Sequence, residues 1–243
     1  MTRSRGLGDV YKRQDYTVYT LREPHGVTGH IIPWNYPMQI IGRTLGASLA
    51  MGNACVLKPS EEACLTALAI GQLANEAGFP EGSINIVTGL GEKAGSSLIK
   101  HPDINHISFT GSVEIGKKVQ TEAAKNLIPV TLELGGKSPQ IVFEDANLEK
   151  ALPFLINAGI QNAGQTCSAS SRILVSKKIY AELIDKMSKL YCKLKVAQAI
   201  DDKDLGPVIS CRQREIITNY LKLSKDLECI SEGKFEMNLP EKG

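Results

Sequence analysis

The sequence lacks several features that mark specialised classes of protein. Its six cysteines contain no CxxC pair, so they resemble neither a dense disulfide framework nor a zinc site. The four histidines have no metal-ligand spacing, and we expect no metal ion. Charges nearly balance, with 28 Lys and Arg against 26 Asp and Glu, which argues against nucleic acid or an anionic membrane as a partner.

Long hydrophobic runs are also missing. The most apolar stretch, residues 40–57, is interrupted by Arg43, Asn53 and several glycines, too many for a membrane span. The N-terminus has no apolar signal core. With 42% hydrophobic residues among 243, the chain nevertheless has enough apolar side chains for a core. These features predict a reduced intracellular protein, and we expect it to be cytoplasmic.

Strand and helix patterns alternate from residue 15 onward. The strand patterns cover residues 16–21, 26–32, 55–57, 84–87, 106–109, 129–134, 140–143 and 172–175. The helical patterns cover residues 38–51, 63–77, 92–99, 112–125, 148–162, 178–196 and 211–226. This alternation predicts βαβ units and a mostly parallel sheet, which binds ligands at the carboxyl ends of its strands.

The two ends of the chain lack this pattern. The first fourteen residues, MTRSRGLGDVYKRQ, are basic and have no helical or strand periodicity. We interpret residues 1–14 as a non-native leader, with a genuine flexible arm as the alternative, and leave them out of the fold prediction. After the predicted helix over 211–226 the residues are polar, and no closing strand follows. This tail indicates an interrupted domain.

Two glycine-rich turns follow predicted strands. GLGEKAG at 89–95 approximates the dinucleotide-binding fingerprint, although Glu92 opposes a phosphate there. GSVEIGKK at 111–118 nearly matches the phosphate-binding loop of nucleotide triphosphatases, but Lys118 stands where a Ser or Thr should bind Mg²⁺. That class is therefore disfavoured. A helix that begins at Ser112 can still bind one phosphate through its free N–H groups.

Three polar side chains have a chemical and a plainer interpretation. Cys167, in GQTCSA, lies in an accessible turn that suits a nucleophile, or it is an ordinary loop cysteine. Glu133 is a lone acid in an apolar strand, where burial would raise its pKa toward that of a general base, or it faces solvent. Asn35, in the rigid turn PWNYP, can donate to an oxyanion or belong to a plain turn. The other five cysteines are interpreted as structural.

Taken together and in this order, the motifs resemble the aldehyde dehydrogenase superfamily. They are PWNYP at 33–37, KPSE at 58–61, FTGS at 109–112, LELGGK at 132–137 and GQTC at 164–167. The separation of 34 positions between Glu133 and Cys167 also fits this family. The resemblance covers residues 15–243.

The resemblance implies oxidation of an aldehyde to a carboxylic acid with NAD as hydride acceptor. Cys167 would form a thiohemiacetal and then a thioester, and Asn35 with the backbone N–H of Cys167 would hold the oxyanion. Glu133 would activate the water that hydrolyses the thioester. Its presence disfavours a member of the family that passes the thioester to coenzyme A. The substrate would be a small-molecule aldehyde.

The resemblance also implies a cofactor site. Lys58 and Glu61 would bind the adenosine ribose, Trp34 and Ser112 would contact the pyrophosphate, Gly91 would line the adenine slot, and Gly111 belongs to the same set of cofactor-binding residues. A carboxylate at position 61 accepts hydrogen bonds from ribose hydroxyls and repels a 2′-phosphate, so we expect NAD rather than NADP.

The fold class implied is α/β, with a Rossmann-like parallel-sheet cofactor domain followed by a truncated α/β catalytic domain. We expect a partial NAD-binding domain over 15–137 and the catalytic domain over 138–243. Family members are longer and carry a Glu-x-Phe-Gly-Pro motif that this chain lacks, so we expect the chain alone to be poorly folded and inactive. The alternative function is an inactive dinucleotide-binding remnant. The full-length parent is expected to be a homodimer or homotetramer.

Overall fold

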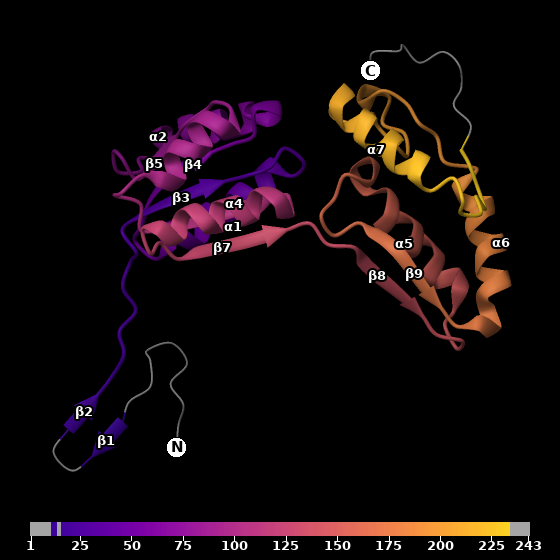
Figure 1. Ribbon diagram of the computed structural model, residues 1–243, viewed down its shortest axis with the longest axis horizontal. Helices are drawn as coiled ribbons and strands as arrows, with labels where there is room; N and C mark the ends of the chain where they lie inside the picture. Colours follow the sequence, from indigo (N-terminus) through magenta and orange to yellow (C-terminus); the bar gives the residue numbers. More distant parts are fainter. Residues whose placement is uncertain (1–10, 14–15, 234–243) are drawn as a thin grey trace. The chain divides into compact units, whose positions relative to one another are not determined.

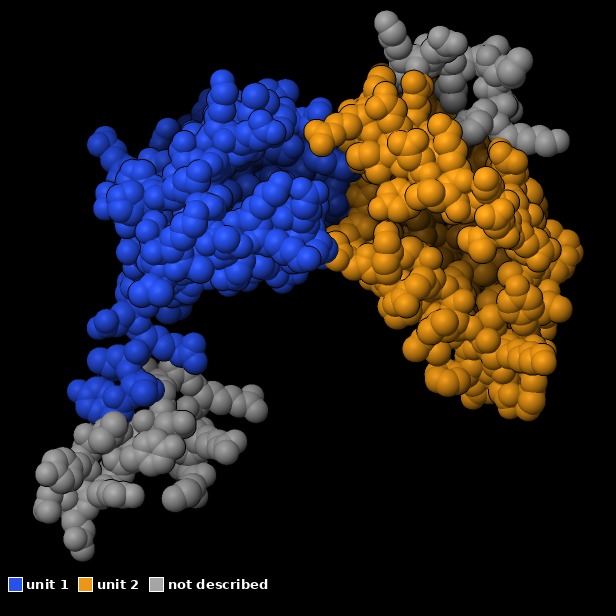
Figure 2. All heavy atoms as spheres, viewed as in Figure 1, with its two compact units in different colours: residues 1–134 blue, residues 135–243 orange. Residues whose placement is uncertain are grey.

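The computed structural model describes residues 11–13 and 16–233 and has two compact units. Figure 2 colours them separately, as residues 1–134 and residues 135–243. Unit 1 ends at Leu134, close to the domain boundary that we expect at Lys137. Among the described residues, no helix combines the length and apolar character that crossing a membrane requires.

A five-stranded parallel sheet forms the centre of unit 1 (Figure 1). Its strands lie in the order β5-β4-β3-β6-β7, and their bounds are Ile84–Ile86, Ala54–Lys58, Val27–Ile31, His106–Gly111 and Val130–Leu134. The chain goes from β3 to β4 on one side and later places β6 on the other side of β3. The strand order therefore reverses between β3 and β6. In such sheets ligands bind beyond the carboxyl ends of the strands at this reversal.

Two pairs of helices cover the two faces of this sheet. The bounds of α1, α2, α3 and α4 are Pro37–Ala50, Leu65–Glu76, Ser96–Lys100 and Val113–Lys125. One apolar cluster joins α1 and α2 to β4, with Leu45 and Leu57 among its buried members. A second cluster joins α3 and α4 to β6 and includes Val119 and Ile107. This helix–sheet–helix layering confirms the α/β class expected for this part of the chain.

A short antiparallel hairpin precedes the sheet. It consists of β1 (Tyr11–Arg13) and β2 (Tyr16–Val18), and it pairs Tyr11 with Val18. The fold prediction left out residues 1–14 and placed no strand there. This is wrong for Tyr11–Arg13, which form β1. Residues 1–10 and 14 lie outside the described residues. Tyr, Thr and Val favour strands, and pairing with β2 is the non-local contact that no local periodicity reveals.

Unit 2 is built on a parallel βαβ unit. Strands β8 (Ser138–Val142) and β9 (Ser170–Val175) pair in parallel and are joined through α5 (Leu148–Ile160). Helix α6 (Tyr180–Tyr191) follows, and α7 (Cys211–Leu223) comes later in the chain. A single apolar cluster contains Val142, Leu155 and Leu183, from β8, α5 and α6. These contacts confirm a second α/β layer arrangement in this unit.

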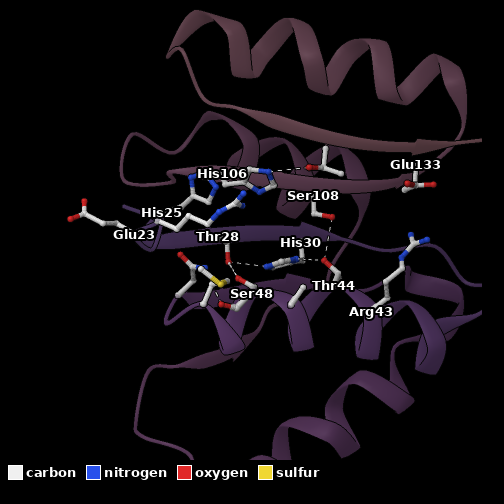
Figure 3. A pocket seen from close by; sticks show the side chains of 15 residues that line it. Glu23, His25, Thr28, His30, Arg43, Thr44, Ser48, His106, Ser108 and Glu133 are labelled. Atoms are coloured by element: carbon white, nitrogen blue, oxygen red, sulfur yellow. Dashed lines mark hydrogen bonds between the residues drawn. The ribbon is translucent and has the colours of Figure 1, made fainter. Parts of the chain in front are cut away.

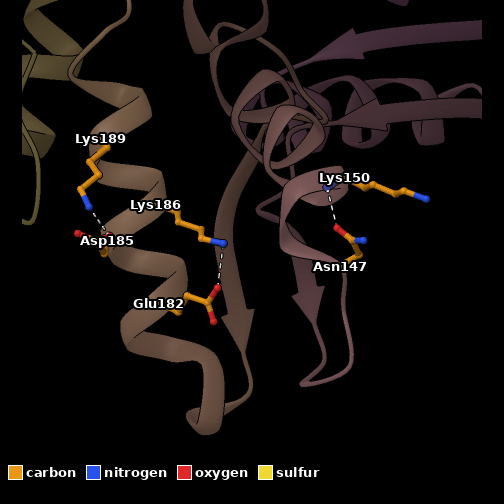
Figure 4. A network of polar contacts seen from close by, with 6 residues as sticks. All are labelled: Asn147, Lys150, Glu182, Asp185, Lys186 and Lys189. Carbon is orange, nitrogen blue, oxygen red and sulfur yellow. Dashed lines mark hydrogen bonds and ion pairs between the residues drawn. The ribbon is translucent and has the colours of Figure 1, made fainter.

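Polar contacts stabilise the helices of unit 2 from outside the core. Figure 4 shows two ion pairs one turn apart on α6, Lys186 with Glu182 at 2.9 Å and Lys189 with Asp185 at 2.6 Å. Both pairs join residues four positions apart, the spacing that places side chains next to each other on a helix. Asn147 caps α5, because its side chain accepts a hydrogen bond from the Lys150 N–H at 3.1 Å.

Three of the predicted helices begin with a turn of another type in the structure, and the helix expected over 211–226 ends at Leu223. The helix expected over 92–99 is a π-helical turn, η2 (Gly91–Gly95), followed by α3. The helix expected over 63–77 begins with a 3₁₀ turn, η1 (Glu61–Ala63), before α2. The helix expected over 178–196 starts with the 3₁₀ turn η4 (Lys177–Ile179) and ends at Tyr191. Side-chain periodicity continues through such turns although the backbone hydrogen-bond pattern changes, so the sequence misplaces these ends.

Candidate active site

The candidate residues of unit 1 lie on the loops or strand ends at one edge of the sheet. Because the strands are parallel, their carboxyl ends meet at this edge. The edge carries Trp34 and Asn35 after β3, Lys58 and Glu61 at and after β4, Gly91 after β5, Gly111 and Ser112 at and after β6, and Glu133 near the end of β7. The structure therefore brings all of the candidate residues of unit 1 to a common edge.

Trp34 and Asn35 belong to the bend between β3 and α1. Both side chains are half-buried. Helix α1 begins with Pro37, whose fixed φ suits the first position of a helix, and the Tyr36 carbonyl accepts the first helical hydrogen bond from Ile40 at 3.0 Å. This helix start fixes the backbone directly after Asn35. The bend adjoins the reversal between β3 and β6.

Lys58 and Glu61 form an ion pair at the end of β4. The Lys58 side chain is only 3% exposed, and its Nζ lies 3.2 Å from Glu61 Oε2, whereas the Glu61 side chain is 48% exposed. A buried ammonium group needs a compensating anion, and Glu61 provides one. Ser60 orders the turn between them by accepting a hydrogen bond from the Glu62 N–H at 3.4 Å. The pair offers both a donor and an acceptor at the sheet edge.

Ser112 begins helix α4 directly after β6. Its Oγ accepts a hydrogen bond from the Ile115 N–H at 3.3 Å, which is the contact of an N-cap residue. A Cβ at Gly111 would lie 2.6 Å from Cζ of Phe109, so only glycine fits this strand end. The helix N-terminus therefore opens at the sheet edge with its partial positive charge, which favours an anionic group.

Two acidic residues lie near these turns. Glu114, in the first turn of α4, forms an ion pair with Lys118 at 2.9 Å, and this hydrogen bond lowers the pKa of Glu114. Lys118 is therefore paired along its own helix. Gly91 is exposed and begins η2, which has Glu92 in its first turn. Just before it, Gly89 has a φ of 145°, a backbone conformation that residues other than glycine rarely adopt.

Glu133 faces solvent on β7. Of our two interpretations of this residue, burial or exposure, the structure has exposure. The reason is the alternation of β7, in which Val130, Leu132 and Leu134 pack on the apolar cluster while Thr131 and Glu133 point to the other face. Glu133 instead lines a pocket on that face.

This pocket was not predicted from the sequence. It has a volume of about 560 Å³ and lies between α1 and the sheet face that carries Thr28 and His30 (Figure 3). Thr28 Oγ1 lies 2.8 Å from His30 Nε2 and 2.8 Å from Ser48 Oγ, and His30 Nδ1 is hydrogen bonded to Thr44 Oγ1. The sequence did carry one signal for this pocket, which is a polar residue at alternate positions of two strands. These residues are Thr28 and His30 in β3, and His106 and Ser108 in β6.

Burial lowers the pKa of two histidines that line the pocket, His30 and His106. His30 lies inside β3 and is 2% exposed. Burial, assisted by the neighbouring His106, lowers the pKa of His30 to about 4. Burial and the nearby His25 also lower the pKa of His106; the two rings are 4.9 Å apart.

Cys167 lies in an exposed turn of unit 2. The turn is closed by a hydrogen bond from the Ala169 N–H to the Thr166 carbonyl at 3.0 Å. Gln165 Nε2 donates to the Asn162 carbonyl at 3.0 Å, and Thr166 Oγ1 donates to the Gln161 carbonyl at 3.1 Å. These contacts anchor the residues that precede the thiol. Cys167 belongs to a different unit from Asn35 and Glu133.

The segment before this turn has a strained backbone. Helix α5 ends at Ile160 rather than at residue 162, and the turn η3 (Gln161–Gly164) follows. Asn162 and Ala163 have φ values of 53° and 54°, and Gly164 has 74°. A left-handed conformation costs about 1–2 kcal/mol for a residue such as Ala163. Strain of this kind is often found next to functional sites.

The remaining cysteines divide into buried and exposed groups. Cys55 is buried and Cys64 is half-buried, as a structural role requires. The structural interpretation is wrong for Cys192, Cys211 and Cys229, which are exposed. Helical or strand spacing places a residue on an element but does not tell whether that face is covered. Within residues 11–13 and 16–233, no group of three or more His, Cys, Asp or Glu residues is arranged to hold a metal ion.

Comparison with known proteins gives consistent matches along the chain. DhaS of Bacillus subtilis is 46% identical over 212 residues, which are 87% of this chain and 43% of that protein. The chloroplastic betaine aldehyde dehydrogenase of Beta vulgaris is 45% identical over 208 residues, 85% of this chain and 42% of that protein. The chain thus spans less than half the length of these relatives.

Solved structures and a family model agree with these matches. The NAD⁺ complex of an aldehyde dehydrogenase from Bacillus cereus has a TM-score of 0.88 and 40% identity, and it covers 91% of this chain and 46% of that one. This similarity extends over both units and confirms the predicted fold. The model named "Aldehyde dehydrogenase family" matches residues 3–243. The chain belongs to the aldehyde dehydrogenase family.

Proposed function

We propose that the whole protein to which this chain belongs oxidises a small-molecule aldehyde to a carboxylic acid, with NAD as hydride acceptor. The observation that carries the proposal is the common edge of the sheet. In a chain of this family, the residues suited to a dinucleotide and to an oxyanion all lie at the carboxyl ends of parallel strands, around the reversal of strand order.

The residues at this edge fit an NAD molecule. The Lys58–Glu61 pair supplies a donor and an acceptor for ribose hydroxyls, and the N-terminus of α4 at Ser112 suits a pyrophosphate. Trp34, Gly91 and Gly111 would complete this site as contacts of the pyrophosphate and the adenine. The exposed carboxylate of Glu61 favours a ribose with a free 2′-hydroxyl, so we propose NAD over NADP. NAD when bound supplies a hydride acceptor.

The proposed chemistry begins with Cys167. Its sulfur forms a bond to the carbonyl carbon of the aldehyde, and the oxyanion that results accepts hydrogen bonds from the Asn35 amide and the Cys167 N–H. The carbon then loses a hydride and becomes a thioester. Glu133 takes a proton from water, the hydroxide adds to the thioester, and the carbon–sulfur bond breaks to release the acid and the thiolate. The exposed turn gives the Cys167 thiol the access to a substrate that its role needs.

We further propose that residues 15–137 serve cofactor binding and residues 138–243 serve catalysis. The division into two compact units at Leu134 supports this assignment. The full-length protein is proposed to be a homodimer or homotetramer, which follows from the family alone.

Cofactor binding can be tested on this chain through its single tryptophan. Trp34 lies at the proposed site, so NAD binding is expected to quench its fluorescence. Lys58→Met should weaken binding by about 10- to 100-fold, because a hydrogen bond from a charged group is lost. Lys100→Met removes an exposed lysine at the end of α3 and serves as the matched control. Equal affinity of all three proteins would contradict the cofactor site.

The chemistry requires a full-length protein that contains this chain. Cys167→Ala is expected to abolish aldehyde oxidation and to leave NAD binding intact, whereas Cys211→Ala, at another exposed cysteine, should keep both. Asn35→Ala should lower kcat by about 10²–10³-fold through loss of an oxyanion donor. Oxidation that survives Cys167→Ala would refute the nucleophile. NAD binding without turnover of any aldehyde would favour the dinucleotide-binding remnant.

A further inference from the structure

Two exposed thiols of unit 2 share one serine as a neighbour. Cys192 is the C-cap residue of α6, and Cys229 lies in the irregular segment 224–233 that follows α7. Cys192 Sγ lies 3.2 Å from Ser231 Oγ, and Cys229 Sγ lies 3.7 Å from the Ser231 carbonyl oxygen. Although Cys192 and Ser231 are 39 positions apart in the sequence, the fold thus gathers both thiols around a single residue.

One thiol belongs to an ordered helix and the other to an irregular segment. Helix α6 packs Leu183 and Met187 into the core. The segment 224–233 is fastened to the same end of α6 by the Ser231 hydroxyl, which donates to the Ser188 carbonyl at 3.4 Å. A disulfide requires a narrow range of distances and angles between its two residues. An irregular, exposed segment beside a fixed helix end can adjust its backbone to meet that geometry.

The exposure of these two cysteines is unusual for free thiols. Free cysteine is among the most buried residue types in folded proteins, because its side chain behaves as a small hydrophobic group. Cys55 follows this rule, whereas Cys192 and Cys229 are both exposed, and neither forms a disulfide. Neither has a role in the proposed oxidation of aldehydes. Access to solvent is what a thiol needs in order to exchange with a small disulfide.

We propose that Cys192 and Cys229 form a reversible disulfide, a redox modification site that takes a low-molecular-weight disulfide such as oxidised glutathione as its oxidant. One protein thiolate attacks the glutathione disulfide, forms a mixed disulfide and releases one reduced glutathione. The second protein thiolate attacks the protein sulfur of that bond and releases the second glutathione. Two protein thiols are oxidised, one glutathione disulfide is reduced, and the two protons remain on the released thiols. The product ties segment 224–233 to the end of α6.

The test is a map of the bonds that form in the native chain. The chain is treated with oxidised glutathione, the remaining thiols are blocked with N-ethylmaleimide, and the proteolytic peptides are identified by mass spectrometry. We expect one dominant linked peptide that joins Cys192 to Cys229 and is cleaved by dithiothreitol. Cys211→Ser should retain this peptide, whereas Cys192→Ser and Cys229→Ser should each lose it. All of these positions are exposed, so the variants are expected to fold.

A parallel sample oxidised in guanidinium chloride measures how much of the linkage the fold causes. There the preference for the Cys192–Cys229 peptide should disappear. Two results would overturn the proposal: glutathione attached singly to Cys192 and Cys229 without a linked peptide, or native linkages spread over the exposed cysteines as in the denatured sample. Because the expected linkage joins Cys192 to Cys229, neither of which has a role in the proposed oxidation of aldehydes, this outcome is independent of the proposed dehydrogenase chemistry.

Discussion

Acidification is expected to destabilise unit 1 through one histidine. His30 is 2% exposed, and both of its ring nitrogens are hydrogen bonded to threonines, Thr28 on the same strand and Thr44 on α1. Burial lowers its pKa from 6.5 to about 4, and His106 on the neighbouring strand adds to the effect. The folded protein therefore holds this ring neutral at a pH where the unfolded chain binds a proton.

The direction and size of the effect follow from the two pKa values. The contribution of His30 to stability is fully present above its unfolded pKa of 6.5 and is lost as the pH falls toward its folded pKa of about 4. One pKa unit corresponds to about 1.4 kcal/mol, so the complete loss is about 3 kcal/mol. Between pH 7 and pH 5 the free energy of unfolding should fall by about 2 kcal/mol. The lowered pKa of His106 acts in the same direction.

Urea unfolding monitored by Trp34 fluorescence measures this quantity, because the only tryptophan of the chain lies in unit 1. Arg43 and Glu133 also line the pocket, and acidic side chains in other parts of the chain bind protons over the same pH range. The test therefore compares the pH dependence of the free energy of unfolding between the chain and His30→Gln. The variant should have lower stability at pH 7 and a shallower loss between pH 7 and pH 5. His101→Gln, at a side chain 57% exposed, is the matched control and should keep the parent slope. Equal pH slopes for the chain and His30→Gln would refute the reasoning.

Two further predictions concern backbone positions. Gly111→Ala should destabilise unit 1 by about 1–3 kcal/mol, because its Cβ would lie 2.6 Å from the buried ring of Phe109, whereas Gly42→Ala, on a part of α1 with open space, should stabilise it by up to about 1 kcal/mol. Urea midpoints compare the two, and an equal effect would contradict the close contact at Gly111. Ala163→Gly should stabilise unit 2 by about 1 kcal/mol, since it relieves a φ of 54°; a lower unfolding midpoint by circular dichroism would contradict strain at this position.

The sequence predicts the order of strands and helices better than their ends. Each buried face leaves a local period, as in α4, where the expected helix over 112–125 differs by one residue from the observed Val113–Lys125. Ends depend on backbone hydrogen bonds instead. Lys178–Ile179 read as part of a long helix but form a 3₁₀ turn, and β1 exists only because β2 pairs with it. Such pairing carries no local signal.

The candidate site was likewise predicted only in part from the sequence. Motifs located the residues at the sheet edge, because a strand followed by glycine, serine or proline must turn there. They did not reveal the pocket, since an alternating Thr28 and His30 looks identical whether α1 covers that face or solvent does. Glu133 shows the same limit, because the apolar residues around it in the strand left burial and exposure both open, and the structure has it exposed. Coverage by other elements is a property of tertiary structure, not of local pattern.

Cofactor preference and stability are linked at the end of β4. Lys58 is buried as the last residue of a central strand, so its charge requires an anion within reach wherever the cofactor is. Glu61 is that anion, and it is also the group that would repel a 2′-phosphate in the proposed site. Replacing Glu61 by a neutral residue to admit NADP would therefore leave a buried cation without its partner. The proposed preference for NAD thus follows partly from how this strand is stabilised, because one carboxylate is required by both.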